Sequence, residues 1–192
     1  MQQPPICYRE LDWPMEKLTE QLLSYFGVEP ATGSNLSRSG FWRIDHLALL
    51  YNCPELVKFF DHWGWRVASA HVYTIDSTTG AGPIHKDYIS PTIDYYSARI
   101  NFPLWGCDQG ETLWYEVDPA SYTATNGPGA GAKHGYWGSN DPNAQEIARV
   151  VLKKPTIMRI DQAHQVRLTG PTAIRSSITV KVTPDPVMMI CG

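Results

Sequence analysis

The chain has 192 residues, of which 43% are hydrophobic, 11% aromatic and 18% charged, and its formal net charge is −3. This composition excludes a disordered protein, and the length is that of one domain. The slight acidity and the lack of a basic run argue against nucleic-acid binding. No apolar stretch approaches the roughly 20 residues of a membrane span. We therefore expect a single domain over residues 1–192 that binds neither nucleic acid nor membrane.

The first third of the chain, residues 1–65, is predicted to be helical. One apolar stripe at helical spacing ends at Gly27 and consists of Met15, Leu18, Leu22 and Tyr25. A second stripe begins near Asn52 and ends at Gly64, and consists of Leu56, Val57, Phe60 and Trp63. Residues 30–40 are polar and rich in Gly and Ser, which predicts a loop.

The pattern changes to short β-rich runs over residues 66–182. These runs are separated by turn residues and cover residues 66–76, 98–105, 112–117, 156–160, 164–168 and 173–182. Several short strands with turn signals predict a mainly β fold, either a sandwich or a jelly roll. The glycine-rich residues 118–140 are predicted to be an inserted surface loop, and Asp141-Pro142 to open a short helix that reaches Val151.

The cysteines predict a reducing compartment. Cys7, Cys53, Cys107 and Cys191 are far apart and form no C-x-x-C pair. Four such residues predict free thiols rather than a disulfide framework. Residues 1–12 also lack the basic and apolar regions of a signal peptide. A cytoplasmic protein is expected.

Two residues in the segment before the second run could bind a metal. His85 and Asp87 are two residues apart, so on an extended backbone their side chains project from the same face. A third ligand must come from another strand, and His164 begins one of the β-rich runs. Two His and one carboxylate leave three coordination positions open, which is the arrangement used by non-haem Fe(II) oxygenases.

A third motif follows ten intervening residues after His164 and consists of Arg175 and Ser177. On a strand these two side chains also share a face. A guanidinium binds a carboxylate through a planar fork, and a hydroxyl adds one hydrogen bond. Arg175 lies in an Ile- and Val-rich run, where a surface arginine is unusual.

The order of these motifs resembles the signature of the 2-oxoglutarate- and Fe(II)-dependent oxygenases, which is H-x-D, a distal His and then R-x-S. The resemblance covers roughly residues 70–182 and implies a double-stranded β-helix, or jelly roll, with supporting helices on one sheet. It implies that His85, Asp87 and His164 bind Fe(II) and that Arg175 and Ser177 bind the distal carboxylate of 2-oxoglutarate. With dioxygen, such an enzyme hydroxylates an unactivated C–H bond, here of a small molecule, an amino acid or a peptidyl residue.

The same resemblance extends to residues 99–104, which are similar to the family's strand after the H-x-D segment. A polar side chain there often reaches the cosubstrate, so Arg99 and Asn101 are candidates for that contact. The spacing between the proximal and distal ligands is longer than in the compact plant-type members. The excess coincides with residues 118–140, which we expect to cover part of the iron site as a lid.

Two other interpretations remain open at this stage. A cupin-type metalloenzyme without 2-oxoglutarate would keep the histidines but has no need for Arg175 and Ser177. In a non-enzymatic β-sandwich that serves as a binding module, His85 and His164 would never meet.

Overall fold

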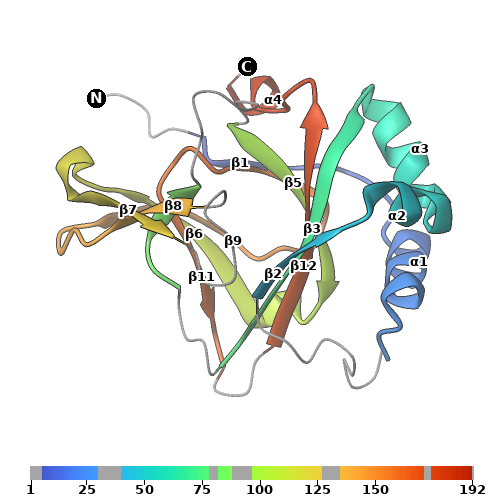
Figure 1. The fold of residues 1–192 in the computed structure, drawn as a ribbon, viewed down its shortest axis with the longest axis horizontal. Coiled ribbons are helices and arrows are strands. Elements are labelled where there is room, and N and C mark those ends of the chain that lie inside the picture. Colours follow the sequence, from blue (N-terminus) through green and yellow to red (C-terminus); the bar gives the residue numbers. More distant parts are fainter. Residues whose placement is uncertain are drawn as a thin grey trace.

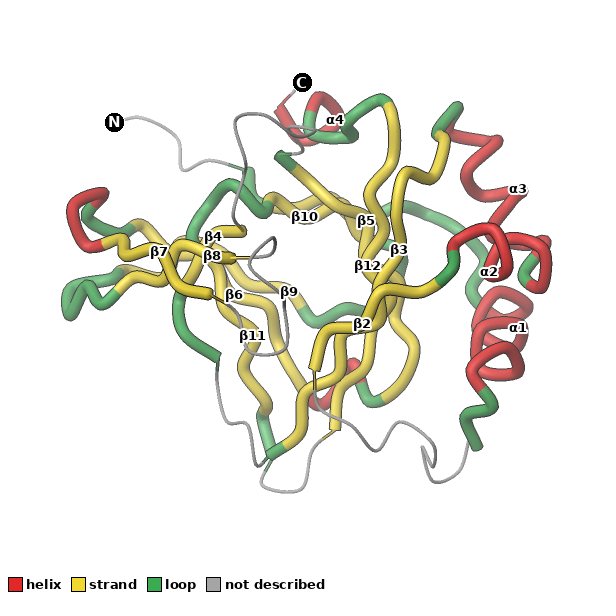
Figure 2. The backbone as a smooth tube through the Cα atoms, viewed as in Figure 1, coloured by secondary structure: helices red, strands yellow, loops and turns green. Residues whose placement is uncertain are grey.

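The computed structural model describes residues 6–29, 40–77, 82–87, 97–126, 135–170 and 174–191. The fold is mainly β, with two antiparallel six-stranded sheets and with helices on the outer side of one of them (Figures 1 and 2). None of the helices in these ranges is long and apolar enough to cross a membrane.

The first sheet, sheet A, has the strand order β1-β10-β5-β12-β3-β2. Its strands are β1 (Tyr8–Glu10), β10 (Thr156–Arg159), β5 (Ala98–Trp105), β12 (Ile174–Thr183), β3 (Arg66–Asp76) and β2 (Gly40–Ile44). The second sheet, sheet B, has the order β7-β8-β4-β11-β6-β9. Its strands are β7 (Tyr122–Asn126), β8 (Gly135–Ser139), β4 (His85–Asp87), β11 (His164–Leu168), β6 (Gly110–Glu116) and β9 (Gln145–Val150).

Helices α1 (Glu16–Phe26) and α3 (Pro54–Trp63) confirm the two predicted helices. Both end at a glycine in the left-handed conformation, Gly27 with φ 61° and Gly64 with φ 69°. The remaining helical elements are α2 (His46–Asn52), α4 (Met188–Cys191) and the 3-10 turns η1 (Cys107–Gln109) and η2 (Pro119–Ser121). The sequence pattern missed α2, whose first turn is capped by the Asp45 side chain.

The two faces of sheet A differ in chemistry because side chains alternate along each strand. On β5, Ala98, Ile100, Phe102 and Leu104 are buried in the main core together with residues of α1 and α3. Figure 1 places these helices on the side of sheet A that faces away from sheet B. The other face, which we call the inner face, carries Arg99 and Asn101 on β5 and Arg175 and Ser177 on β12. Hydrophobic packing on one face therefore leaves a polar face turned toward sheet B.

An apolar cluster joins the two sheets at β1 and β10 of sheet A and β6 of sheet B. Tyr8 on β1 stacks on Trp114 on β6 with ring centroids 5.5 Å apart. Cys7, Cys107 and Met158 lie in the same small apolar cluster as Trp114. The cysteines whose side chains are described, Cys7, Cys53 and Cys107, are buried and form no disulfide bond.

The structure corrects two predictions for the middle of the chain. Much of the segment 118–140, predicted as a surface loop, forms the hairpin strands β7 and β8, and β8 pairs with β4. Residues 127–134, including the expected tip of the lid, lie outside the described residues. The helix predicted from Asp141 to Val151 is instead strand β9, which pairs with β6. In both places hydrogen bonding to a distant strand outweighs local propensity.

Candidate metal centre

Strands β4 and β11 bring the two predicted histidines together. They pair antiparallel, with His85 directly opposite His164, and their ring centroids are 4.5 Å apart. Asp87 lies two residues beyond His85 on the same strand, so its side chain projects from the same face. Asp87 Oδ1 is 3.8 Å from His85 Nε2 and 4.0 Å from His164 Nε2. Side-by-side strands thus turn a sequence separation of 76 intervening residues into one cluster.

These three residues could hold a metal ion. One donor atom from each lies within 4.8 Å of the other two. Two donors bound to one ion at about 2.1 Å are separated by about 3.0–3.4 Å. The donors of His85, Asp87 and His164 are therefore slightly more open than in an occupied site, and small side-chain rotations would bring them around an ion. Two imidazoles with one carboxylate suit a borderline metal such as Fe(II).

The outer nitrogen of each histidine is held by the backbone. His85 Nδ1 lies 2.9 Å from the carbonyl oxygen of Pro83, and His164 Nδ1 lies 2.9 Å from that of Gln162. A carbonyl oxygen only accepts, so each Nδ1 donates its proton, and in the neutral form of either ring Nε2 is then the unprotonated nitrogen. Metal-binding histidines in proteins are usually oriented in this way. Both Nε2 atoms face Asp87.

Burial favours the neutral form of His164 that metal binding requires. Desolvation is the main cause that lowers the pKa of His164 from its ordinary 6.5 to about 4, and the neighbouring His85 adds to it. The carboxylate of Asp87 opposes this shift. A neutral imidazole at neutral pH leaves its nitrogen lone pair available to a metal.

Arg99 on β5 contacts the carboxylate of Asp87 from the opposite sheet. Its Nη2 lies 2.5 Å from Asp87 Oδ2. Burial would raise the pKa of the Asp87 carboxyl, but electrostatic interactions outweigh burial and hold that pKa below its ordinary value; the largest is with Arg99, and those with the two histidines and Lys181 follow. Arg99, expected as a cosubstrate contact, thus pairs with a metal-ligand candidate.

Arg175 and Ser177 are buried on the inner face of β12, with exposed fractions of 2% and 1%. Arg175 Nη2 donates to Thr112 Oγ1 on β6 at 3.3 Å, and its Nε has no hydrogen-bond partner among the described residues. No carboxylate in the described ranges forms an ion pair with it. Gly110 makes room for this side chain, since a Cβ there would come 2.9 Å from Arg175 Cδ. The guanidinium is therefore a buried cation without a counter-ion in this part of the chain.

Two further residues lie on the inner face between these groups. Asn101, half-buried on β5, is opposite Thr179 on one side and Thr156 on the other. Tyr73 on β3 lies opposite Ser177 of β12 and was not predicted from the sequence. Burial raises the pKa of the Tyr73 hydroxyl; the positive charge of Arg175 lowers that pKa, and the negative charge of Asp87 raises it. Tyr73 therefore lies within electrostatic reach of both motifs, and its alternation with His71 in the β-rich run was the signal available.

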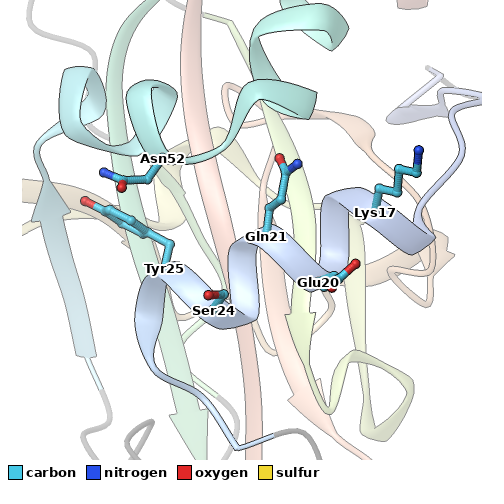
Figure 3. A pocket seen from close by; sticks show the side chains of 6 residues that line it. All are labelled: Lys17, Glu20, Gln21, Ser24, Tyr25 and Asn52. Atoms are coloured by element: carbon cyan, nitrogen blue, oxygen red, sulfur yellow. The ribbon is translucent and has the colours of Figure 1, made fainter.

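A separate hollow lies away from this centre. It has a volume of about 550 Å³ and is lined by Lys17, Glu20, Gln21, Ser24, Tyr25 and Asn52 (Figure 3). These residues belong to α1 and α2, on the far side of sheet A from sheet B. The hollow contains no group of His, Cys and carboxylate ligands and takes no part in the metal centre.

No family model matches the chain, and no curated protein is similar to it.

Proposed function

We propose that this protein is an Fe(II)- and 2-oxoglutarate-dependent oxygenase that hydroxylates an unactivated C–H bond of a small molecule, an amino acid or a peptidyl residue. The observation that carries the proposal is the convergence of His85, Asp87 and His164 on one point between the sheets. The buried, uncompensated Arg175 supports the cosubstrate part.

The three ligand candidates fit Fe(II) by chemistry and number. When bound there, Fe(II) supplies the dioxygen chemistry that hydroxylation of a C–H bond needs. The chain's own residues prepare the site: Pro83 and Gln162 orient the imidazoles through their carbonyls, and burial keeps His164 neutral. Three protein ligands leave three coordination positions for a cosubstrate and dioxygen.

The position of Arg175 suits a five-carbon diacid. Its partner Thr112 lies two residues from Trp114, and Trp114 is opposite His164. Two residues along an antiparallel strand span about 7 Å, which is comparable to the length of 2-oxoglutarate. One end of the diacid would reach the metal while the other meets Arg175 and the Ser177 hydroxyl. Arg175 then gains the counter-ion that the described residues do not supply.

We further propose that the core is a double-stranded β-helix. Support comes from two strand orders, β10-β5-β12-β3 in sheet A and β4-β11-β6-β9 in sheet B. The chain crosses from sheet A to sheet B between β3 and β4, between β5 and β6, and between β10 and β11. In such a roll, β7 and β8 are an inserted hairpin that extends sheet B beyond β4.

The balanced reaction consumes one 2-oxoglutarate and one dioxygen for each hydroxylated substrate, and releases succinate and carbon dioxide. The first test is therefore succinate formation by the full chain with Fe(II), 2-oxoglutarate and air. We expect slow uncoupled turnover from the wild type and none from Asp87→Ala, which removes one of three ligands. Asp161→Ala is the matched control, because Asp161 pairs with Arg159 rather than with the histidines.

The outcome also separates the alternatives. Iron binding without any effect of 2-oxoglutarate would indicate a cupin-type metalloenzyme. A wild-type protein that binds neither iron nor 2-oxoglutarate would contradict the proposal and favour a binding module.

A further inference from the structure

The two oxygen atoms of Asp87 have different neighbours. Oδ2 contacts Arg99 Nη2 at 2.5 Å, whereas Oδ1 is the atom nearest to the Nε2 atoms of His85 and His164, at 3.8 and 4.0 Å. Arg99 comes from sheet A and the other three residues from sheet B. The carboxylate is thus divided between a guanidinium on one sheet and the two imidazoles on the other.

We infer that Arg99 is a positioning residue that holds Oδ2 of Asp87 and leaves Oδ1 alone for the metal. This inference rests on the metal centre of the proposed function. It assigns Arg99 a role different from the cosubstrate contact expected from the sequence. A carboxylate that gives one oxygen occupies one coordination position. If both oxygens turned to the metal, they would take a position that the cosubstrate needs.

The surroundings of Arg99 suit this role. Its side chain is only 14% exposed, and its guanidinium carbon lies 5.6 Å from the centre of the Phe41 ring. Its Nε is buried without a hydrogen-bond partner in the described part of the chain. The guanidinium therefore lies between an aromatic ring and the carboxylate, where a charge-assisted hydrogen bond is stronger than in water.

Asp87 also needs such support because its strand is short. β4 has three residues, and Asp87 is its last. The backbone N–H of Asp87 donates to the carbonyl of Ile160 at 2.9 Å, which fixes the main chain. That bond leaves the carboxylate free to turn about its own side-chain torsions. Arg99 fixes the side chain from the opposite sheet.

The test uses Co(II) as a spectroscopic probe in the full chain, without dioxygen or turnover. The absorption spectrum of protein-bound Co(II) reports its coordination number. Arg99→Met keeps a side chain of similar reach but removes every donor. We expect its Co(II) spectrum to shift toward a higher coordination number. We also expect the affinity of the Co(II) protein for 2-oxoglutarate, measured by calorimetry, to fall about tenfold or more.

A matched control is provided by Arg159, which forms a second half-buried Arg–Asp pair among the described residues. Its Nη2 and Nε contact Asp161 at 2.7 and 2.9 Å, and Asp161 is not a ligand candidate. Arg159→Met should leave the Co(II) spectrum unchanged and the 2-oxoglutarate affinity within about threefold of wild type. If Arg99→Met fails to fold, Arg99→Gln takes its place, since its amide is too short to reach Oδ2.

The outcomes separate the inference from the proposed function. If the wild type binds no Co(II), the metal centre itself is refuted. If the wild type binds Co(II) and Arg99→Met gives the same spectrum, the positioning role is refuted while the metal centre stands. A lower 2-oxoglutarate affinity with an unchanged spectrum of the Co(II) protein would also refute it, and would make Arg99 a direct cosubstrate contact.

Discussion

Replacing Arg175 with methionine should stabilise the ligand-free protein and weaken its binding of 2-oxoglutarate, the cosubstrate that we propose. Arg175 is 2% exposed, and the hydrogen bond to Thr112 Oγ1 at 3.3 Å is a long one. Its Nε is unpaired, and no carboxylate among the described residues compensates its charge. Folding therefore removes the Arg175 guanidinium from water, and the single long hydrogen bond offsets little of the desolvation free energy.

The size of the gain follows from known replacements of buried charges. Exchanging a buried ion pair for apolar side chains of similar volume is neutral or stabilising by about 1–4 kcal/mol, and a cation without a counter-ion has no Coulombic attraction to lose. For a chain of this length, 1 kcal/mol raises the melting temperature by about 2–4 °C. We expect Arg175→Met to raise the free energy of unfolding by about 2 kcal/mol and the melting temperature by about 4–8 °C. Urea denaturation and calorimetry of the metal-free protein measure both quantities.

Bound 2-oxoglutarate should stabilise the wild type more than it stabilises Arg175→Met. A hydrogen bond to a charged group contributes about 1.5–3 kcal/mol, so losing Arg175 should weaken 2-oxoglutarate binding by about 10- to 150-fold. At a concentration 100 times its dissociation constant, a ligand stabilises the folded state by about 2.7 kcal/mol. 2-Oxoglutarate should therefore raise the melting temperature of the Fe(II)-loaded wild type and leave that of Arg175→Met nearly unchanged.

Arg167→Met is the control for this experiment. Arg167 is 43% exposed and pairs with Glu111 at 2.9 Å, so its loss should change stability by less than about 1 kcal/mol. The reasoning is refuted if Arg175→Met destabilises the metal-free protein by more than about 1 kcal/mol, because the charge would then be compensated in the folded state.

Two other perturbations test the site from the glycine beside Arg175 and from a ligand candidate. Gly110→Ala should displace Arg175, since the new Cβ lies 2.9 Å from Arg175 Cδ and 3.2 Å from the carbonyl of Arg167. We expect a loss of about 1–3 kcal/mol in urea denaturation and weaker 2-oxoglutarate binding, and wild-type values in both would contradict this. The pKa of His164 is about 4 in the folded protein and 6.5 ordinarily. Above pH 6.5 the imidazole is neutral in both the folded and the unfolded chain, so its protonation does not lower the stability of the metal-free protein there. That stability falls as the pH drops toward 4, by up to about 3 kcal/mol, and His164→Gln should flatten this part of the denaturation curve. Equal losses in both proteins would show that His164 is not the group responsible.

The sequence determined the elements whose signals are local. Gly27 and Gly64 ended the predicted helices because a left-handed residue terminates a helix wherever the chain goes next. Short β-rich runs bounded by turn residues located β3 and β5 with the observed bounds. The i, i+2 spacing of His85 and Asp87 placed them on one face because side chains alternate along a strand.

Local signals failed where a distant strand decided the conformation. The segment Gln145–Val150 contains good helix formers but pairs with β6. The glycine-rich segment after Asp118 resembled a loop, yet β8 pairs with β4 and extends the sheet that carries His85. Strand pairing rewards backbone hydrogen bonds to partners far along the chain, and no window of sequence contains that information.

The tertiary structure alone decided how the polar residues of the inner face were divided. The sequence identified Arg99 and Arg175 as cations for a cosubstrate but could not distinguish their partners. The register of β5 places Arg99 against Asp87, and β12 places Arg175 against Thr112 of the facing sheet. Residue type and spacing thus determined which side chains could take part. The packing of two sheets determined which of them meet, because electrostatic pairing depends on distances that only the folded chain sets.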